Sequence, residues 1–163
     1  MSKRIEVKYC IRCGSAVERQ ARYGQVRPVC PSCGWIHFSD PKVAAAVLVE
    51  EQGKILLVQR GCNPYRGLWT LPAGFVNAAE APDTAARREC LEETGLNVRI
   101  TRILDIRSGR EHEGGADFVI VYQAVVESGV LAAADDADAA AWFSRDALPE
   151  LAFEATKYIL KNF

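Results

Sequence analysis

The chain has 163 residues, of which 49% are hydrophobic and 25% are charged, and its formal net charge is −1. This length favours one main domain with at most a small appendage, and the composition excludes a disordered, collagen-like or membrane-spanning protein. The longest apolar run, at residues 43–49, is too short to cross a bilayer, and the first seven residues contain no apolar signal segment. We therefore expect a cytoplasmic protein with a buried core.

Two segments of the chain differ in composition. The first carries paired cysteines and few aliphatic residues, whereas an α/β pattern begins at Val43, after a polar joint at residues 39–42. Residues 1–39 contain seven Lys and Arg against two Asp and Glu, and a four-thiolate zinc site would lower this balance from +5 to about +3. These differences predict two domains, at residues 1–40 and 41–163, and the paired cysteines of the first indicate a small zinc ribbon.

The second segment alternates predicted strands and helices. The run at residues 43–49 indicates a strand buried on both faces, and a turn at Gly53 leads to the next strand. Asp83 is expected to cap the first helix, and Gly95 is expected to end it. The other predicted strands lie at residues 55–58, 69–71, 98–106, 118–126 and 139–143, and the helices extend from Asp83 to about Thr94 and over residues 154–161.

The strongest pattern is a set of three glutamates, Glu89, Glu92 and Glu93, at positions i, i+3 and i+4. On a helix they share one face, where their repulsion is unfavourable unless a cation compensates it. Mg²⁺ suits this role because it prefers carboxylate and water oxygens and shares its coordination shell with substrate phosphates. Arg88 supplies a counter-charge and is predicted to pair with Glu80, which would hold the preceding loop against the helix. The other interpretation is a solvated helix face.

Residues 74–96 resemble the signature sequence of the Nudix hydrolases. The residues that fit its spacing are Gly74, Glu80, Arg88, Glu89, Glu92, Glu93, Gly95 and Leu96. Cys90 departs from the pattern, since the family usually has an aliphatic residue there, but cysteine buries well as a small hydrophobe. The resemblance covers residues 43–163 and implies an α/β fold, an α/β/α sandwich around a mixed sheet.

The resemblance also implies an enzyme that depends on Mg²⁺ or Mn²⁺ and directs water onto a phosphorus atom of a diphosphate. Its metal ligands would be three carboxylates and one backbone carbonyl, from Glu89, Glu92, Glu93 and Gly74. Glycine at position 74 would permit a tight turn close to the metal. Glu80 and Arg88 would orient these groups.

The general base and the substrate contacts are left open by the sequence. The base is one of the signature glutamates or an acid in the loop after Arg107, and the alternative for that loop is an ordinary solvated turn. Its acids are Glu111, Glu113 and Asp117, and His112 could contact phosphate or be a bystander. Aromatic rings that either stack a base or pack in the core are Tyr65, Trp69, Phe75, Tyr122 and Phe153. Arginines that either bind phosphate or lie on the surface are Arg60, Arg107 and Arg110.

Four cysteines form two Cys-x₂-Cys pairs, each followed by glycine, at Cys10, Cys13, Cys30 and Cys33. This spacing indicates a tetrahedral Zn²⁺ site, and the site is structural because no ligand position is left open. Two disulfides are the alternative, but no secretory context favours them. Cys62 and Cys90 lack a partner base and are expected to be inert, and His37 is expected to pack in the joint.

A zinc ribbon before a Nudix domain resembles the NADH pyrophosphatase branch and a broader set of ribbon-bearing relatives. The NADH branch carries a proline-rich motif after the signature, whereas this chain has no proline between Pro82 and Pro149. The same absence removes the proline that often marks ADP-ribose hydrolases. From the breadth of family usage alone, the resemblance favours a small-molecule nucleotide as partner, with ADP-ribose or a related ADP-linked compound first and dinucleotides such as FAD or NADH next. No membrane partner is expected, and homodimers are common in the family.

Two other classes of function stay open. A non-catalytic nucleotide sensor is one, although such modules usually lose the signature carboxylates, and all of them are present here. A hydrolase of nucleotide-capped RNA is the other, with basic side chains of the first segment contacting the strand. These side chains are Arg12, Arg19, Arg22 and Arg27, and their alternative role is to decorate a solvated ribbon.

Overall fold

The computed structural model describes residues 6–163 and divides the chain into two compact units, Met1–Asp40 and Pro41–Phe163. We refer to them as the N-terminal unit and the C-terminal unit. Within residues 6–163, no helix is long and apolar enough to span a membrane.

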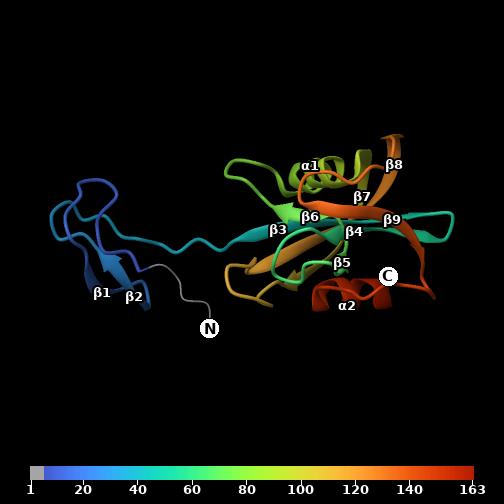
Figure 1. The fold of residues 1–163 in the computed structure, drawn as a ribbon. Coiled ribbons are helices and arrows are strands. Elements are labelled where there is room, and N and C mark those ends of the chain that lie inside the picture. Colours follow the sequence, from blue (N-terminus) through green and yellow to red (C-terminus); the bar gives the residue numbers. More distant parts are fainter. Residues whose placement is uncertain (1–5) are drawn as a thin grey trace. The chain divides into compact units, whose positions relative to one another are not determined.

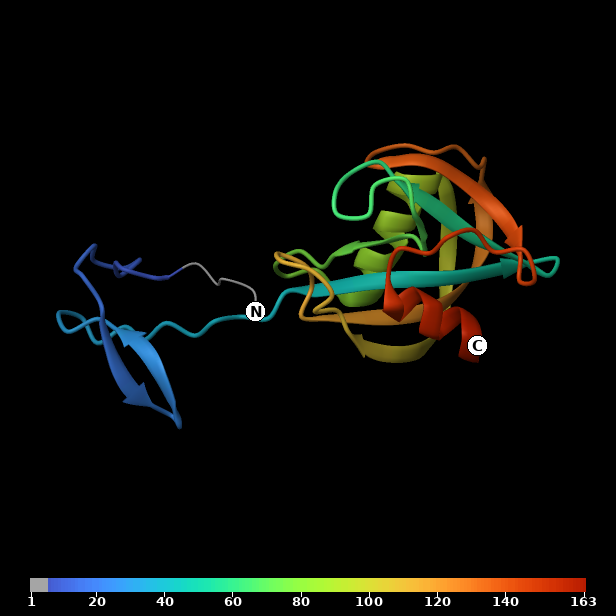
Figure 2. The ribbon, with the colours of Figure 1, turned by 60° about the horizontal axis from the view of Figure 1, so that its bottom comes forward.

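The N-terminal unit is built around one hairpin. Strands β1 (Glu18–Arg22) and β2 (Gln25–Val29) pair in antiparallel fashion and are joined by two residues (Figures 1 and 2). The buried hydrophobic residues in its described part are Cys10, Val29 and Cys30. Small units with so few buried apolar residues usually need a metal site or disulfides in addition to their core.

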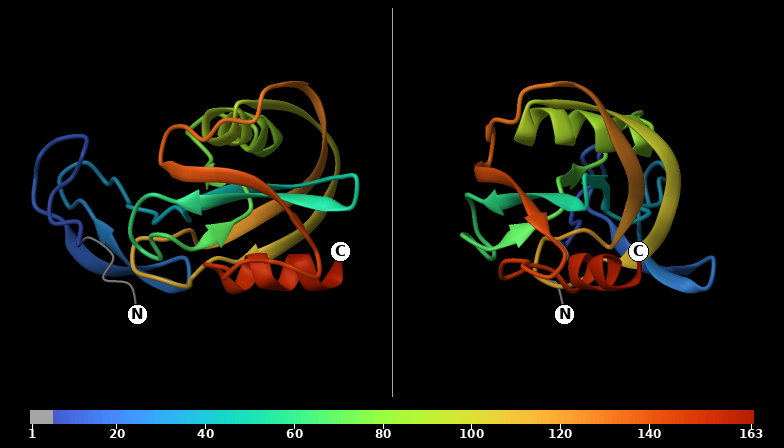
Figure 3. Two further views of the ribbon diagram at one scale, coloured as in Figure 1. Left: turned by 45° about the vertical axis from the view of Figure 1, so that its right-hand side comes forward. Right: turned by 90° about the vertical axis from the view of Figure 1, so that its right-hand side faces the viewer.

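The C-terminal unit is a seven-stranded mixed sheet with a helix on each side (Figures 1 and 3). Its strands are β3 (Val43–Glu51), β4 (Lys54–Arg60), β5 (Trp69–Thr70), β6 (Ala73–Phe75), β7 (Leu96–Ser108), β8 (Phe118–Gly129) and β9 (Ala137–Ser144). The helices are α1 (Pro82–Thr94) and α2 (Glu154–Asn162). The main strand order is β5-β4-β3-β8-β7, with β6 also paired to β3 and β9 to β4. The predicted α/β/α sandwich is therefore confirmed.

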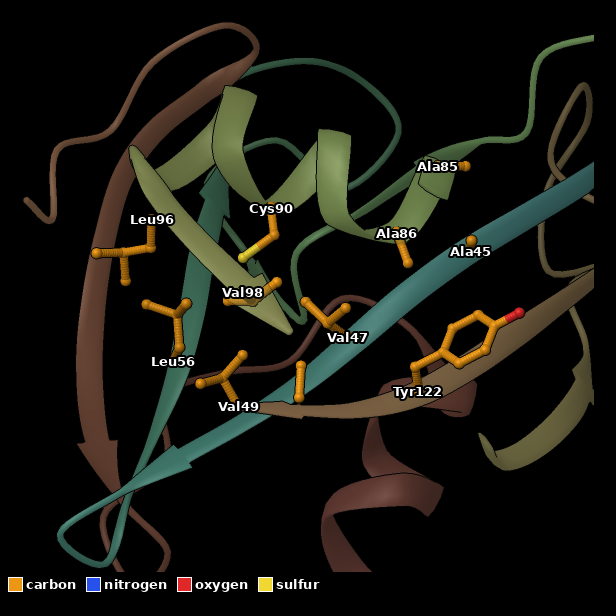
Figure 4. Packing of buried hydrophobic residues seen from close by; sticks show 11 residues of the cluster. Ala45, Val47, Val49, Leu56, Ala85, Ala86, Cys90, Leu96, Val98 and Tyr122 are labelled. Atoms are coloured by element: carbon orange, nitrogen blue, oxygen red, sulfur yellow. The ribbon is translucent and has the colours of Figure 1, made fainter. Parts of the chain in front are cut away.

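Strand β3 separates two hydrophobic clusters, which explains its continuous apolar sequence. Successive side chains of a strand point to opposite faces. Accordingly Val47 and Val49 pack toward α1, together with the buried thiol of Cys90 (Figure 4). Ala46 and Leu48 pack toward α2. A helix on each side of the sheet therefore requires apolar residues at successive positions of this strand, from Val43 to Val49.

The predicted strands and helices are present, and several extend further than expected. The prediction that Asp83 caps α1 is wrong: the helix begins at Pro82, and Ala81 occupies the cap position without a side-chain hydrogen bond. Proline suits the first helical position because the N–H that it lacks would have no partner inside the helix. Gly95 ends α1 as predicted, with a φ of 70° and its N–H bonded to the carbonyl of Leu91.

Candidate functional site

Strand β6 brings Gly74 against the carboxylate helix. Gly74 pairs with Ala45 of β3, and a Cβ atom at position 74 would lie 2.1 Å from Cδ of Glu89. The expectation of a tight turn here is wrong, since Gly74 lies within a strand and its φ is not positive. Glycine is required because the Glu89 carboxylate occupies the space of a side chain.

A Gly74→Ala variant is expected to displace the Glu89 carboxylate and to lower turnover about 100-fold. Moving a positioned group by about 1 Å can lower the rate of a reaction by this factor. The thermal midpoint should change little because the atoms that must move are the end of a flexible side chain. Turnover under saturating Mg²⁺ and thermal melting measure the two effects.

Gly53→Ala is the matched control for this variant. Gly53 has a φ of 73° and no atom within 4 Å of its added Cβ. Alanine should strain that turn by about 1–2 kcal/mol and leave turnover unchanged. A Gly74→Ala enzyme with normal turnover would show that the position of Glu89 does not matter.

Arg88 donates hydrogen bonds to four groups of the site. Its Nε and Nη2 donate to the two carboxylate oxygens of Glu80, at 2.8 and 2.9 Å, so the predicted pair is formed. Its Nη1 donates to Glu89 at 2.6 Å and to Glu92 at 2.9 Å, and Nη2 also donates to the carbonyl of Phe75 at 3.1 Å. The hydrogen bonds from Arg88 lower the pKa of Glu80 to about 2. Arg88 thus fixes the loop before α1 and partly neutralises the carboxylate face.

Glu93 is the buried member of the set. Its side chain accepts a hydrogen bond from the backbone N–H of Ala73 at 2.9 Å, and the residue is only 5% exposed. Burial raises the pKa of Glu93 to about 9, and burial also raises the pKa of Glu89. Burial favours the neutral acids, so a bound cation would have to offset the cost of ionising them.

The loop between β8 and β9 adds two acids that the sequence did not single out. Asp135 and Asp136 line the same cavity as Glu89, and the charge of Asp135 contributes to the raised pKa of Glu89. The carbonyl of Asp136 accepts the N–H of Gly61 at 2.8 Å, and its carboxylate accepts the thiol of Cys62 at 3.4 Å. In the sequence, these two acids stand out only as adjacent aspartates within an Ala-rich segment.

The carboxylates border a cavity of about 580 Å³ in the C-terminal unit. Its walls come from the β3 and β8 face of the sheet, from α2 and from the loop between β7 and β8. Ala44 and Ala46 have short side chains, which leaves room beneath α2. Five acids and two arginines line the cavity, namely Glu89, Glu111, Glu113, Asp135, Asp136, Arg60 and Arg88. The floor of the cavity is therefore apolar, and acids outnumber arginines among the residues that line it.

The three loop acids considered as general base have different environments. The two oxygens of Glu111 accept the N–H groups of Glu154 and Ala155, at 2.7 and 3.0 Å, and so cap the start of α2. Asp117 accepts the backbone N–H of Lys42 at 2.9 Å and pairs with Arg110 at 3.0 Å. Glu113 is exposed and lines the cavity.

Only some of the other residues predicted to contact the substrate line the cavity. His112, Phe75 and Phe153 line the cavity, and Arg60 lies with its Cζ 5.0 Å from the centre of the Phe153 ring. Trp69 and Tyr122 pack against the hydrophobic clusters instead. Tyr65, Arg107 and Arg110 do not line this cavity; Tyr65 contacts the Phe153 ring edge-on, Arg107 lies over the Tyr158 ring, and Arg110 pairs with Asp117.

The N-terminal unit brings its four cysteines together. The sulfur atoms of Cys10, Cys13, Cys30 and Cys33 all lie within 4.8 Å of one another. The measured Sγ–Sγ distances are 3.6 Å for Cys10 and Cys33 and 3.5 Å for Cys13 and Cys30. A disulfide requires about 2.05 Å, whereas a tetrahedral Zn²⁺ with bonds near 2.3 Å separates its sulfurs by roughly 3.8 Å. The geometry is compatible with zinc, and the His37 ring packs on Trp35 outside the cluster.

The α/β/α sandwich, with its carboxylate helix beside a cavity, is the architecture that the resemblance of residues 74–96 to the Nudix signature implied. The model of the NUDIX domain matches residues 40–163, and the chain belongs to this family.

Two relatives and one solved structure illustrate the membership. An ADP-ribose pyrophosphatase of Methanocaldococcus jannaschii is 38% identical over 127 residues, which cover 77% of this chain and 75% of the relative. The human 8-oxo-dGDP phosphatase NUDT18 is 35% identical over 111 residues, 66% of this chain but only 33% of that protein. The crystal structure of a NUDIX hydrolase from Nitrosomonas europaea has a TM-score of 0.85 at 30% identity and covers 95% of this chain and 89% of its own.

Proposed function

We propose that the protein is a magnesium-dependent hydrolase that cleaves the diphosphate of a nucleoside diphosphate linked to another group. ADP-ribose or a related ADP-linked compound is the leading substrate. The observation that carries the proposal is the cavity in which the carboxylate of Glu89, bound by Arg88, meets an apolar floor and the Phe153 ring. Hydrolysis of a nucleotide diphosphate requires both parts, one for the phosphates and one for the base.

The carboxylate face fits a hard divalent cation. Glu89, Glu92 and Glu93 supply oxygen donors, and the absence of a side chain at Gly74 lets the Glu89 carboxylate approach the β6 backbone. We assign these three carboxylates and the Gly74 carbonyl as the groups that would hold Mg²⁺. When bound, the ion would neutralise phosphate oxygens and lower the pKa of a bound water.

The remaining residues position the reaction. Arg88 holds Glu80, Glu89 and Glu92 in a fixed arrangement through charge-assisted hydrogen bonds, which cost no reorganisation during the reaction. We assign Glu113 as the loop acid best placed to accept the proton of the attacking water, because the carboxylates of Glu111 and Asp117 are engaged in the hydrogen bonds described above. A signature glutamate is the alternative base.

The charge of the cavity supports a diphosphate in preference to a triphosphate. Acids outnumber arginines in its lining by five to two, and Arg88 is engaged by three glutamates. A triphosphate carries more negative charge than a diphosphate ester and would require more compensation. The archaeal relative named as an ADP-ribose pyrophosphatase supports the same choice.

Other substrates remain candidates within the same chemistry. Dinucleotides such as NADH or FAD and nucleotide-capped RNA contain the same linkage, and the name of the human relative adds 8-oxo-dGDP. A non-catalytic sensor would keep the cavity without turnover. We also propose that the four cysteines bind a structural Zn²⁺, since four thiolates close its coordination shell.

A hydrolysis screen distinguishes these possibilities. The protein is incubated with Mg²⁺ and each of ADP-ribose, NADH, NAD⁺, FAD, diadenosine polyphosphates, nucleotide sugars, nucleoside triphosphates and 8-oxo-dGDP. Phosphate is measured with and without added phosphatase, which reveals monophosphate products. ADP-ribose is expected to give AMP and ribose 5-phosphate with the highest kcat/KM. A folded, zinc-loaded protein that releases no product from any compound would contradict the proposed activity and favour the sensor.

A further inference from the structure

The N-terminal unit exposes two aromatic rings side by side. Tyr23 is 77% exposed and Phe38 is 47% exposed, and their ring centres lie 6.1 Å apart at an interplanar angle of 31°. Tyr23 is the first residue of the two-residue loop that joins β1 to β2. Large aromatic surface left in water is unfavourable, so a pair of such rings in a small unit requires an explanation.

The backbone conformation of Tyr23 is unusual for a residue with a large side chain. Tyr23 has a φ of 50° and Gly24 a φ of 74°, the two positive values of a type I′ hairpin turn. Asn, Asp and Gly are the residues that favour the first of these positions, and a bulky side chain there is an outlier. Burial cannot compensate the strain because the ring is exposed. The turn at Gln52 and Gly53 has the same pair of positive φ values, so the feature that sets Tyr23 apart is the exposed aromatic ring at such a position.

Arginines complete the same face of the hairpin. Arg27 lies opposite Gln20 in the strand register and places its Cζ 4.6 Å from the centre of the Phe38 ring. Its Nε donates to the carbonyl of Arg22 at 3.3 Å, and Arg22 donates to the Gln20 side chain at 2.7 Å. The result is a surface of two exposed rings with the Arg27 guanidinium over one of them, and Arg22 lies on the same face of the hairpin as Arg27.

We propose that this surface, formed by Arg22, Tyr23, Arg27 and Phe38, binds single-stranded nucleic acid. The rings would stack on unpaired bases, and the arginines would contact the phosphates. A duplex keeps its bases stacked inside, out of reach of the rings. A second copy of this surface would bring like charges together. The inference concerns the N-terminal unit only and does not depend on the proposed hydrolysis.

Binding is measured on the full-length, zinc-loaded protein by fluorescence anisotropy, with labelled oligouridine, oligothymidine and a duplex of the same length. Both single strands are expected to bind, more tightly than the duplex and with an affinity that falls steeply with added salt. Tyr23→Asn removes one ring while keeping a residue that the turn accepts, and it should weaken binding about tenfold. Phe38→Ala should do the same.

Two controls separate this role from folding and from catalysis. Val26→Ala changes an exposed residue on the other face of the hairpin, in register with Ala21, and should bind as the wild type does. Tyr23→Asn should retain the wild-type rate of ADP-ribose hydrolysis, whereas Glu92→Gln should lose that rate and keep nucleic-acid binding. Equal affinity for duplex and single strands, or unchanged binding after loss of either ring, would overturn the proposal. So would a concentration-dependent dimer that Tyr23→Asn abolishes, since the surface would then bind a second copy.

Discussion

A Glu92→Gln variant is expected to lose turnover by about 100-fold or more while its thermal midpoint stays close to that of the wild type. The side chain of Glu92 is 44% exposed, so its pair with Arg88 contributes little to stability. An electrostatic group aimed at a transferring phosphoryl group is worth about 100-fold or more in kcat. The measurement is kcat for the substrate found in the screen, determined across a Mg²⁺ titration, together with a melting curve.

Glu127→Gln is the matched control for this prediction. The Glu127 side chain is 47% exposed and pairs with Arg99 at 3.0 Å, so the substitution removes a comparable surface ion pair outside the cavity. Its turnover should equal that of the wild type. If Glu92→Gln turned over at a near-normal rate in Mg²⁺, Glu92 could not be a ligand of the catalytic cation.

Local patterns in the sequence predicted most of the fold. The continuous apolar run of β3 and the helical spacing of Glu89, Glu92 and Glu93 depend on neighbours a few residues away, and the structure shows both. Gly95 ends α1 because glycine adopts a positive φ without penalty. The start of α1 shows where such patterns fail. Asp83 was expected to cap the helix, but the helix starts at Pro82 and its cap residue, Ala81, has no side-chain hydrogen bond.

Contacts between distant segments could not be predicted from one sequence. Asp136 reaches the cavity from the loop after β8, and Glu111 caps a helix that begins 43 residues later in the chain. The sequence pattern singled out Gly74, but the space that a side chain would need there is taken by Glu89, 15 positions away. The signature therefore located the candidate site, while the loop acids and cavity walls depend on tertiary packing.

A Cys30→Ser variant is expected to lose its zinc and to unfold the N-terminal unit. Cys30 is 1% exposed and is one of three buried hydrophobic residues in the described part of that unit. Structural zinc contributes an apparent binding free energy of about 10–16 kcal/mol in small domains, and comparable zinc modules are unfolded without metal. Metal analysis of the purified protein should fall from one zinc per chain to almost none. Hydrogen exchange should become fast across β1 and β2.

Unfolding of the same Cys30→Ser variant tests whether the two units fold independently. The C-terminal unit has two hydrophobic clusters of its own, so its unfolding transition should persist in Cys30→Ser. Cys62→Ser is the control, because Cys62 is an exposed free thiol outside the four-cysteine cluster, and this variant should keep full zinc content and slow exchange. A wild-type protein without stoichiometric zinc, or a Cys30→Ser variant with a protected hairpin, would contradict the zinc assignment. If the unfolding transitions of the N-terminal and C-terminal units were both lost in Cys30→Ser, the C-terminal unit would draw stability from the metal site.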